Sequence, residues 1–208
     1  MKEVLCFGDS NTWGYNPVDK TRYPRDVRWT GALQRELGPG YHVIEEGQNA
    51  RTTVWDDPVS GDKNGLRYLG PCLESHKPLD LVIILLGVND LKHRFAVTAY
   101  DIAQSAGRLV DLARKSDTGP AGRPPEALLV APPPLGKLTE LAEMFSGGAE
   151  KSRQLGARFR ERAELLGCAF FDAGSVVRSS DLDGVHWAPE YHAKLAAALA
   201  AETRRLIG

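Results

Sequence analysis

The sequence predicts a three-layer α/β/α domain of the flavodoxin-like type, with a five-stranded parallel sheet between two layers of helices. First, apolar strand-like runs alternate with amphipathic helical patterns along the chain. Second, the run from Leu81 to Leu86 is apolar without interruption, as expected for a strand covered by helices on both faces. Third, four short polar clusters each sit just after an apolar strand-like run, and ligands in such sheets bind beyond the carboxyl ends of the strands.

The expected strands are the five apolar runs, and the uninterrupted run is expected at the centre of the sheet. They span residues 4–7, 42–44, 81–86, 127–131 and 169–171. The expected helices span residues 26–37, 98–115, 148–166 and 189–207. Thr98-x-x-Asp101 resembles a capping box, and Pro189 suits the first position of a helix. A further short helix over 64–75 is expected to break near Gly70-Pro71, because proline lacks a backbone donor.

Length and composition narrow the class of protein. The 208 residues fit a single domain over 1–208, and 42% hydrophobic with 25% charged residues is typical of a soluble globular chain. A net charge of -1 without a basic stripe argues against nucleic-acid binding. No apolar run reaches membrane-spanning length and none precedes the first strand at Glu3, so we expect a cytoplasmic protein that does not bind membranes.

The three cysteines are expected to be buried hydrophobic residues. Cys6, Cys72 and Cys168 are odd in number and lack paired spacing, which argues against both a disulfide framework and a zinc site. We therefore expect neither a metal nor a cofactor.

Two polar clusters at opposite ends of the chain suggest nucleophilic catalysis. Ser10 follows the first strand, where a hydroxyl is exposed at the edge of the sheet, but it needs a base to take its proton. Asp183 and His186 are three residues apart, so the carboxylate can orient Nδ1 and leave Nε2 facing Ser10. No other histidine has a carboxylate in so tight a frame, and His192 is expected to be structural. Alone, Gly8-Asp9-Ser10 would be read as a turn.

A third and a fourth cluster can supply an oxyanion hole. Asn89, after the central strand, can donate its side-chain amide to the developing negative charge of an acyl-transfer transition state. Backbone N–H groups of Ser10 and of the 47–50 loop can complete the hole. The alternative for Asn89-Asp90 is a capping role at a helix or turn.

The four clusters, in this order, resemble the four sequence blocks of the SGNH (GDSL-type) hydrolases. Longer strings resemble the arylesterase and acyltransferase branch of that family; they span residues 6–14, 28–31, 45–47, 50–53 and 171–176. The resemblance implies the SGNH hydrolase fold, with Ser10 as nucleophile, His186 as base and Asp183 as its orienting carboxylate. It also implies an oxyanion hole formed by the Ser10 and Ala50 amides and Asn89. Ala50 stands where the wider family has glycine, which restricts the loop conformation.

The substrate is expected to be a small ester with a short acyl group, and water or an alcohol is the expected acceptor. Bulky side chains beside the active blocks predict a narrow apolar acyl site, although core packing is the alternative. The predicted substrate-binding residues are Asn11, Trp13, Val88, Val185 and Phe145, with Tyr15 and Met144 nearby. The 132–148 connection is expected to fold over the site mouth. The resemblance implies a homo-oligomer, commonly an octamer, that favours acyl transfer.

Three other functions remain open from the sequence. A carbohydrate acetyl esterase would use the same mechanism on a different leaving group. A metal-dependent phosphoesterase would instead use Asp9, Asn89, Asp90, Asp183 and His186 as ligands, leaving the serine idle. A flavodoxin-like binding module without catalysis is the third, although no phosphate-binding Gly-x-x-x-x-Gly-Lys loop is present.

Overall fold

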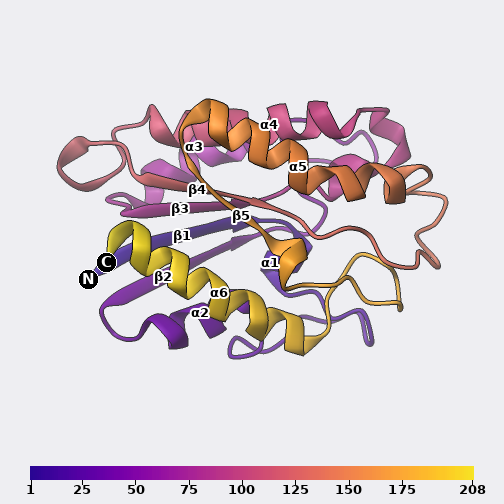
Figure 1. Ribbon diagram of the computed structural model, residues 1–208, viewed down its shortest axis with the longest axis horizontal. Coiled ribbons are helices and arrows are strands. Elements are labelled where there is room, and N and C mark those ends of the chain that lie inside the picture. Colours follow the sequence, from indigo (N-terminus) through magenta and orange to yellow (C-terminus); the bar gives the residue numbers. More distant parts are fainter.

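The computed structural model describes residues 1–208 and confirms the predicted α/β architecture. One sheet of five parallel strands has the order β2-β1-β3-β4-β5. Helices α3, α4 and α5 cover one face, and α2 and α6 cover the other (Figure 1). Both termini lie at the edge of the sheet opposite the carboxyl ends of the strands (Figure 1).

The elements have the following bounds: β1 Lys2–Gly8, α1 Ser10–Trp13, α2 Trp29–Leu37, β2 Tyr41–Gly47, α3 Gly65–His76, β3 Leu81–Leu85, η1 Asn89–Leu91, η2 His93–Phe95, α4 Ala99–Arg114, η3 Pro120–Gly122, β4 Glu126–Ala131, α5 Gly148–Leu166, β5 Ala169–Asp172, η4 Ala173–Ser175 and α6 Pro189–Ile207.

Strand β3 lies at the centre of the sheet, as predicted, and all five of its residues are buried. Val82 and Ile84 point into the core beneath α3, α4 and α5, while Ile83 packs into the core on the other face. A strand that contributes to two cores has no face for polar residues, which explains its continuous apolar sequence. Cys6 and Cys72 are buried as predicted, but Cys168 is only half-buried.

Helix α3 corrects the predicted break near Gly70-Pro71. The helix runs without interruption from Gly65 to His76, with Pro71 inside it. Pro71 lies on the exposed face, where water can satisfy the carbonyl that loses its donor, and Leu69 and Leu73 anchor the opposite face in the core.

Two helix starts differ in how well the sequence predicted them. α2 begins at Trp29 and not at residue 26, because Arg28 is extended (φ -59°, ψ 142°) and its side chain turns to Glu45. α4 has the predicted capping box, with Thr98 and Asp101 bonded reciprocally.

The 132–147 connection forms no helix. It packs against the loop that carries Asp183: the Gly136 N–H donates to the Gly184 carbonyl at 2.8 Å, and the Thr139 hydroxyl donates to the Leu182 carbonyl at 2.6 Å. No helix combines the length and the apolar composition needed to span a lipid bilayer.

Candidate active site

The candidate site lies where the order of the strands reverses. The chain moves from β1 outward to β2 and then crosses to β3 on the other side of β1, so β1 and β3 are neighbours whose connections leave in opposite directions. Ligands in open α/β sheets bind at such a switch point. Ser10 follows β1 and Asn89 follows β3, so the fold brings two of the predicted residues to this point.

Ser10 is the first residue of the short helix α1. Asp9 caps this helix by accepting the backbone N–H of Asn11 at 3.0 Å. Gly47, at the end of β2, lets α1 come close: a Cβ there would lie 2.1 Å from the backbone nitrogen of Trp13. Side-chain capping and this close backbone approach fix the direction of the serine hydroxyl.

Three of the predicted residues form a continuous hydrogen-bonded chain. His186 Nε2 lies 2.9 Å from Ser10 Oγ, and His186 Nδ1 lies 2.6 Å from Asp183 Oδ2. Because the carboxylate can only accept, Nδ1 carries the proton, and Nε2 is free to accept from the serine. The arrangement is that of a serine nucleophile with an oriented base.

Hydrogen bonds within the loop fix the positions of Asp183 and His186. Asp183 Oδ1 accepts the backbone N–H groups of Val185 and His186, both at 2.9 Å. Burial opposes the ionisation of Asp183, but the hydrogen bond from His186 and its backbone partners outweigh it, so the pKa of this carboxyl is lowered. The ring of Tyr15 lies 4.2 Å from that of His186, centroid to centroid, and restricts the imidazole from one side.

The predicted oxyanion donors also have free hydrogens. The backbone N–H groups of Ser10 and Ala50 donate to no acceptor within the protein. Asn89 Nδ2 donates one hydrogen to the Arg51 carbonyl at 3.2 Å, which fixes the amide and leaves the other hydrogen available. Ala50 has φ 65°, in the left-handed region that glycine adopts more easily.

Arg51 and Thr53 have structural roles that the sequence did not indicate; Thr53 donates its backbone N–H to the Asp90 carboxylate. The Arg51 side chain is buried and stacks over the ring of Phe7, its guanidinium carbon 4.2 Å from the centroid. It donates to the Gly8 carbonyl at 2.9 Å and to the Glu46 carbonyl, joining the ends of β1 and β2. Arginine is rarely buried unless its charged group has partners, and nothing in the neighbouring sequence indicates that Arg51 is buried.

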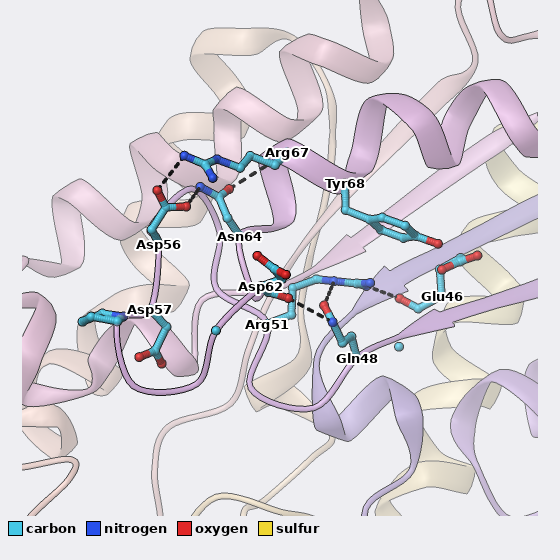
Figure 2. Close-up of a pocket in the computed structure, with 12 residues that line it drawn as sticks. Glu46, Gln48, Arg51, Asp56, Asp57, Asp62, Asn64, Arg67 and Tyr68 are labelled. Atoms are coloured by element: carbon cyan, nitrogen blue, oxygen red, sulfur yellow. Dashed lines mark hydrogen bonds and ion pairs between the residues drawn. The ribbon is translucent and has the colours of Figure 1, made fainter.

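Figure 2 shows Arg51 extending from its loop toward Gln48 and Glu46. These residues line a polar cavity of about 870 Å³ that also includes Asp56, Asp62 and Arg67. Ser10, Asn89, Asp183 and His186 do not line this cavity, so it is separate from the candidate catalytic centre.

The ligand set of the metal hypothesis is not assembled. Each carboxylate has a different partner: Asp183 is hydrogen-bonded to His186, Asp9 caps α1, and Asp90 accepts a hydrogen bond from Thr53. The metal-ligating side chains whose donor atoms lie within 4.8 Å of one another are those of Glu46, Cys72 and His76.

The predicted substrate-binding residues lie in two environments. Val88, Val185 and Phe145 belong to the same buried cluster and are 2% to 3% exposed, so Phe145 offers almost no surface to a ligand in this conformation. Asn11 donates to the Val185 carbonyl at 3.3 Å, and Trp13 is partly exposed beneath the Arg22 guanidinium. Their contact with substrate stays a prediction.

His192 is structural, as expected. It is fully buried, and its Nδ1 accepts the Trp29 backbone N–H at 3.3 Å. Burial lowers the pKa of His192 to about 3, so the ring is neutral at physiological pH.

Comparison with known proteins identifies the family of the chain. The model of the GDSL-like lipase/acylhydrolase family matches residues 6–197. The chain is similar to a carbohydrate acetylesterase from Sinorhizobium meliloti, with 43% identity, a TM-score of 0.95, and coverage of 99% of this chain and 100% of that one. It is also similar to the aryl esterase of M. smegmatis, with 42% identity, a TM-score of 0.95 and the same coverage.

A more distant structure shares the fold alone. A member of the lipolytic G-D-S-L family from Veillonella parvula has 14% identity and a TM-score of 0.69, with 97% of each chain covered. Among curated proteins, none matches the chain. The family model covers most of the sequence, and the close structures have the same five-stranded α/β fold. The chain therefore belongs to the GDSL-like lipase/acylhydrolase (SGNH) family of ester hydrolases.

Proposed function

We propose that this hydrolase is a serine esterase for short-chain acyl esters, with Ser10 as nucleophile, His186 as general base and acid, and Asp183 as the orienting carboxylate. One observation carries the proposal: the unbroken chain from Ser10 Oγ to His186 Nε2 at 2.9 Å and from His186 Nδ1 to Asp183 at 2.6 Å.

The reaction runs through an acyl-enzyme. His186 accepts the proton of Ser10 as Oγ bonds to the ester carbonyl carbon, and the carbonyl oxygen becomes an oxyanion. The amides of Ser10, Ala50 and Asn89 donate to it; each such donor contributes about 3 to 4 kcal/mol. His186 then protonates the leaving alcohol as the ester C–O bond breaks. Water, activated by the same ring, hydrolyses the acyl-serine and regenerates Ser10.

A short acyl group suits the burial around the site. Val88 directly precedes Asn89, and Val185 lies between Asp183 and His186; both are packed into the core, which leaves little room for a long chain. The leaving group is less restricted, because the catalytic groups contact only the carbonyl. Similarity to an aryl esterase and to a carbohydrate acetylesterase at nearly equal identity supports both aryl acetates and acetylated sugars as candidates.

The first experiment compares p-nitrophenyl acetate, hexanoate and decanoate as substrates of the wild type and of Ser10→Ala, with EDTA present. We expect the fastest turnover on the acetate, no effect of EDTA, and loss of activity in the variant. Ser175→Ala is the control, since this serine is exposed, ends η4, and donates its hydroxyl to the Asp172 carbonyl. Activity that requires a metal and survives without Ser10 would instead favour the phosphoesterase class.

The leaving group and the acceptor need separate assays. Acetate release from acetylated xylose, compared with phenyl acetate, distinguishes a carbohydrate esterase from an aryl esterase. Ester formation from an added alcohol in water tests acyl transfer. The homo-oligomer, with an octamer as the leading size, stays a prediction that light scattering after size-exclusion chromatography can test.

A further inference from the structure

One buried hydrogen-bonded pair links the two segments that supply the oxyanion donors. Asp90 directly follows Asn89 and is wholly buried. Its carboxylate accepts the backbone N–H of Thr53 at 3.1 and 3.2 Å and also accepts the Thr53 hydroxyl. Thr53 is three residues after Ala50, so this pair connects the loop after β2 to the turn after β3.

Asp90 is buried without a cationic partner. Asp90 forms no ion pair: the ammonium group of Lys92 pairs with Asp57 and interacts with Asp90 only at longer range, while the nearby Asp9 carboxyl adds repulsion. Burying a carboxyl group in this way is unfavourable unless its hydrogen bonds compensate. A fold that needed only apolar packing here would place a hydrophobic residue at this position, so the Thr53 contacts indicate a more specific role.

The oxyanion loop needs such a constraint, because Ala50 is held in an unfavourable conformation. A residue with a Cβ at φ 65° is strained by about 1 kcal/mol or more, and such strain persists only when the surroundings over-determine the backbone. Relaxation of Ala50 toward negative φ would change the direction of its N–H group. The Thr53–Asp90 contacts and the Asn89–Arg51 hydrogen bond hold the residues that follow Ala50 in the chain. They therefore oppose this relaxation.

We infer that Asp90 is a positioning residue for ester hydrolysis, which acts through Thr53 to hold the Ala50 and Asn89 amides in the arrangement that a tetrahedral oxyanion requires. The inference rests on the proposed function, in which these two amides stabilise the transition state. Asp90 itself contacts neither the substrate nor the reacting atoms.

Paired variants at both ends of the contact test the inference. Thr53→Val removes the hydroxyl and keeps the shape, while Thr53→Ser keeps the hydroxyl. Asp90→Ala removes all acceptors, whereas Asp90→Asn can still accept the Thr53 N–H and donate to its hydroxyl. Asp80→Asn is the matched control: Asp80 directly precedes β3 at the opposite edge of the sheet and accepts the Glu3 backbone N–H at 2.9 Å.

The measurements are kcat and KM for p-nitrophenyl acetate, with the thermal midpoint of each variant as the check on folding. Loss of an interaction made only in the transition state lowers kcat and kcat/KM together. We expect a fall of about 10-fold to 100-fold for Asp90→Ala and about 5-fold for Thr53→Val, with KM within about 2-fold. Thr53→Ser, Asp90→Asn and Asp80→Asn should stay within about 3-fold of the wild type.

A second readout separates positioning from general loosening. A boronic acid forms a tetrahedral adduct with a catalytic serine, so its Ki should rise in Thr53→Val in proportion to the loss in kcat. Equal kcat in folded Thr53→Val and Thr53→Ser overturns the inference, and the Thr53 pair decides the matter if Asp90→Ala does not fold. If instead Ser10→Ala retains wild-type activity, the proposed function fails, and that outcome is distinct from failure of the Asp90 role.

Discussion

Replacement of Asp183 by asparagine tests the position of the His186 proton in the proposed catalytic chain of Ser10, His186 and Asp183. The carboxylate has three donors: two backbone N–H groups at 2.9 Å face Oδ1, and His186 Nδ1 faces Oδ2 at 2.6 Å. Asparagine has one oxygen, which will face the two backbone donors. Its NH₂ group then faces Nδ1, which must become an acceptor, so the ring proton moves to Nε2. In that tautomer His186 cannot accept the proton of Ser10.

The expected loss follows from this tautomer change. In a serine protease the same substitution lowers kcat by about 10⁴, which corresponds to about 5.5 kcal/mol of transition-state stabilisation. We expect Asp183→Asn to lose kcat for p-nitrophenyl acetate at pH 8 by about 10³ to 10⁴, with the fold intact by circular dichroism. Asp181→Asn, an exposed neighbour on the same loop, should be unaffected. A folded Asp183→Asn within 10-fold of the wild type would refute the reasoning.

Three further predictions concern the oxyanion hole and the core. Asn89→Ala should lower kcat for p-nitrophenyl acetate by about 10² to 10³ with little change in KM. Ala50→Gly should change the free energy of unfolding by less than about 1 kcal/mol, because relief of strain offsets the added freedom of the unfolded chain, whereas Ala50→Val should lose more than that; urea denaturation measures both. His192→Leu should destabilise by about 1 to 3 kcal/mol at pH 8, because the Trp29 N–H loses its acceptor. The pKa of His192 is lowered in the folded state, so the wild-type unfolded chain binds the extra proton below pH 6.5, and the difference between the two proteins should narrow by about 2 kcal/mol at pH 5.

Most of the fold was predictable because its signals are local. The continuous apolar run at Leu81 marked the central strand, and alternation with amphipathic segments marked the layers. The hydrogen-bonded contact between Asp183 and His186 was predictable for the same reason: the two residues are close in sequence, and parallel strands bring their carboxyl ends to one edge. Only the pairing with Ser10, 176 residues away, required the fold.

The missed features depend on contacts between distant segments. Arg51 would be expected at the surface, but the rings of Phe7 and Tyr68 and two carbonyls receive it in the interior. The break predicted in α3 was wrong because exposure of Pro71 lets solvent satisfy the freed carbonyl, and exposure depends on how the helix packs. Neither environment can be read from the neighbouring sequence.

Two buried carboxyl groups at the carboxyl ends of the strands, those of Asp9 and Asp90, reduce the stability of the fold. Burial raises the pKa of Asp9 and that of Asp90 to about 6, above the ordinary value for aspartate. Both folded-state values are raised, so the folded chain binds more protons than the unfolded chain between about pH 4 and pH 6, and each ionised carboxylate destabilises the fold above that range. One of these carboxylates caps the helix that presents Ser10, and the other bonds the loop that presents Ala50. If Ser10 and Ala50 have the roles proposed above, two unfavourable charges at these positions are better explained by preorganisation for catalysis than by a contribution to folding stability.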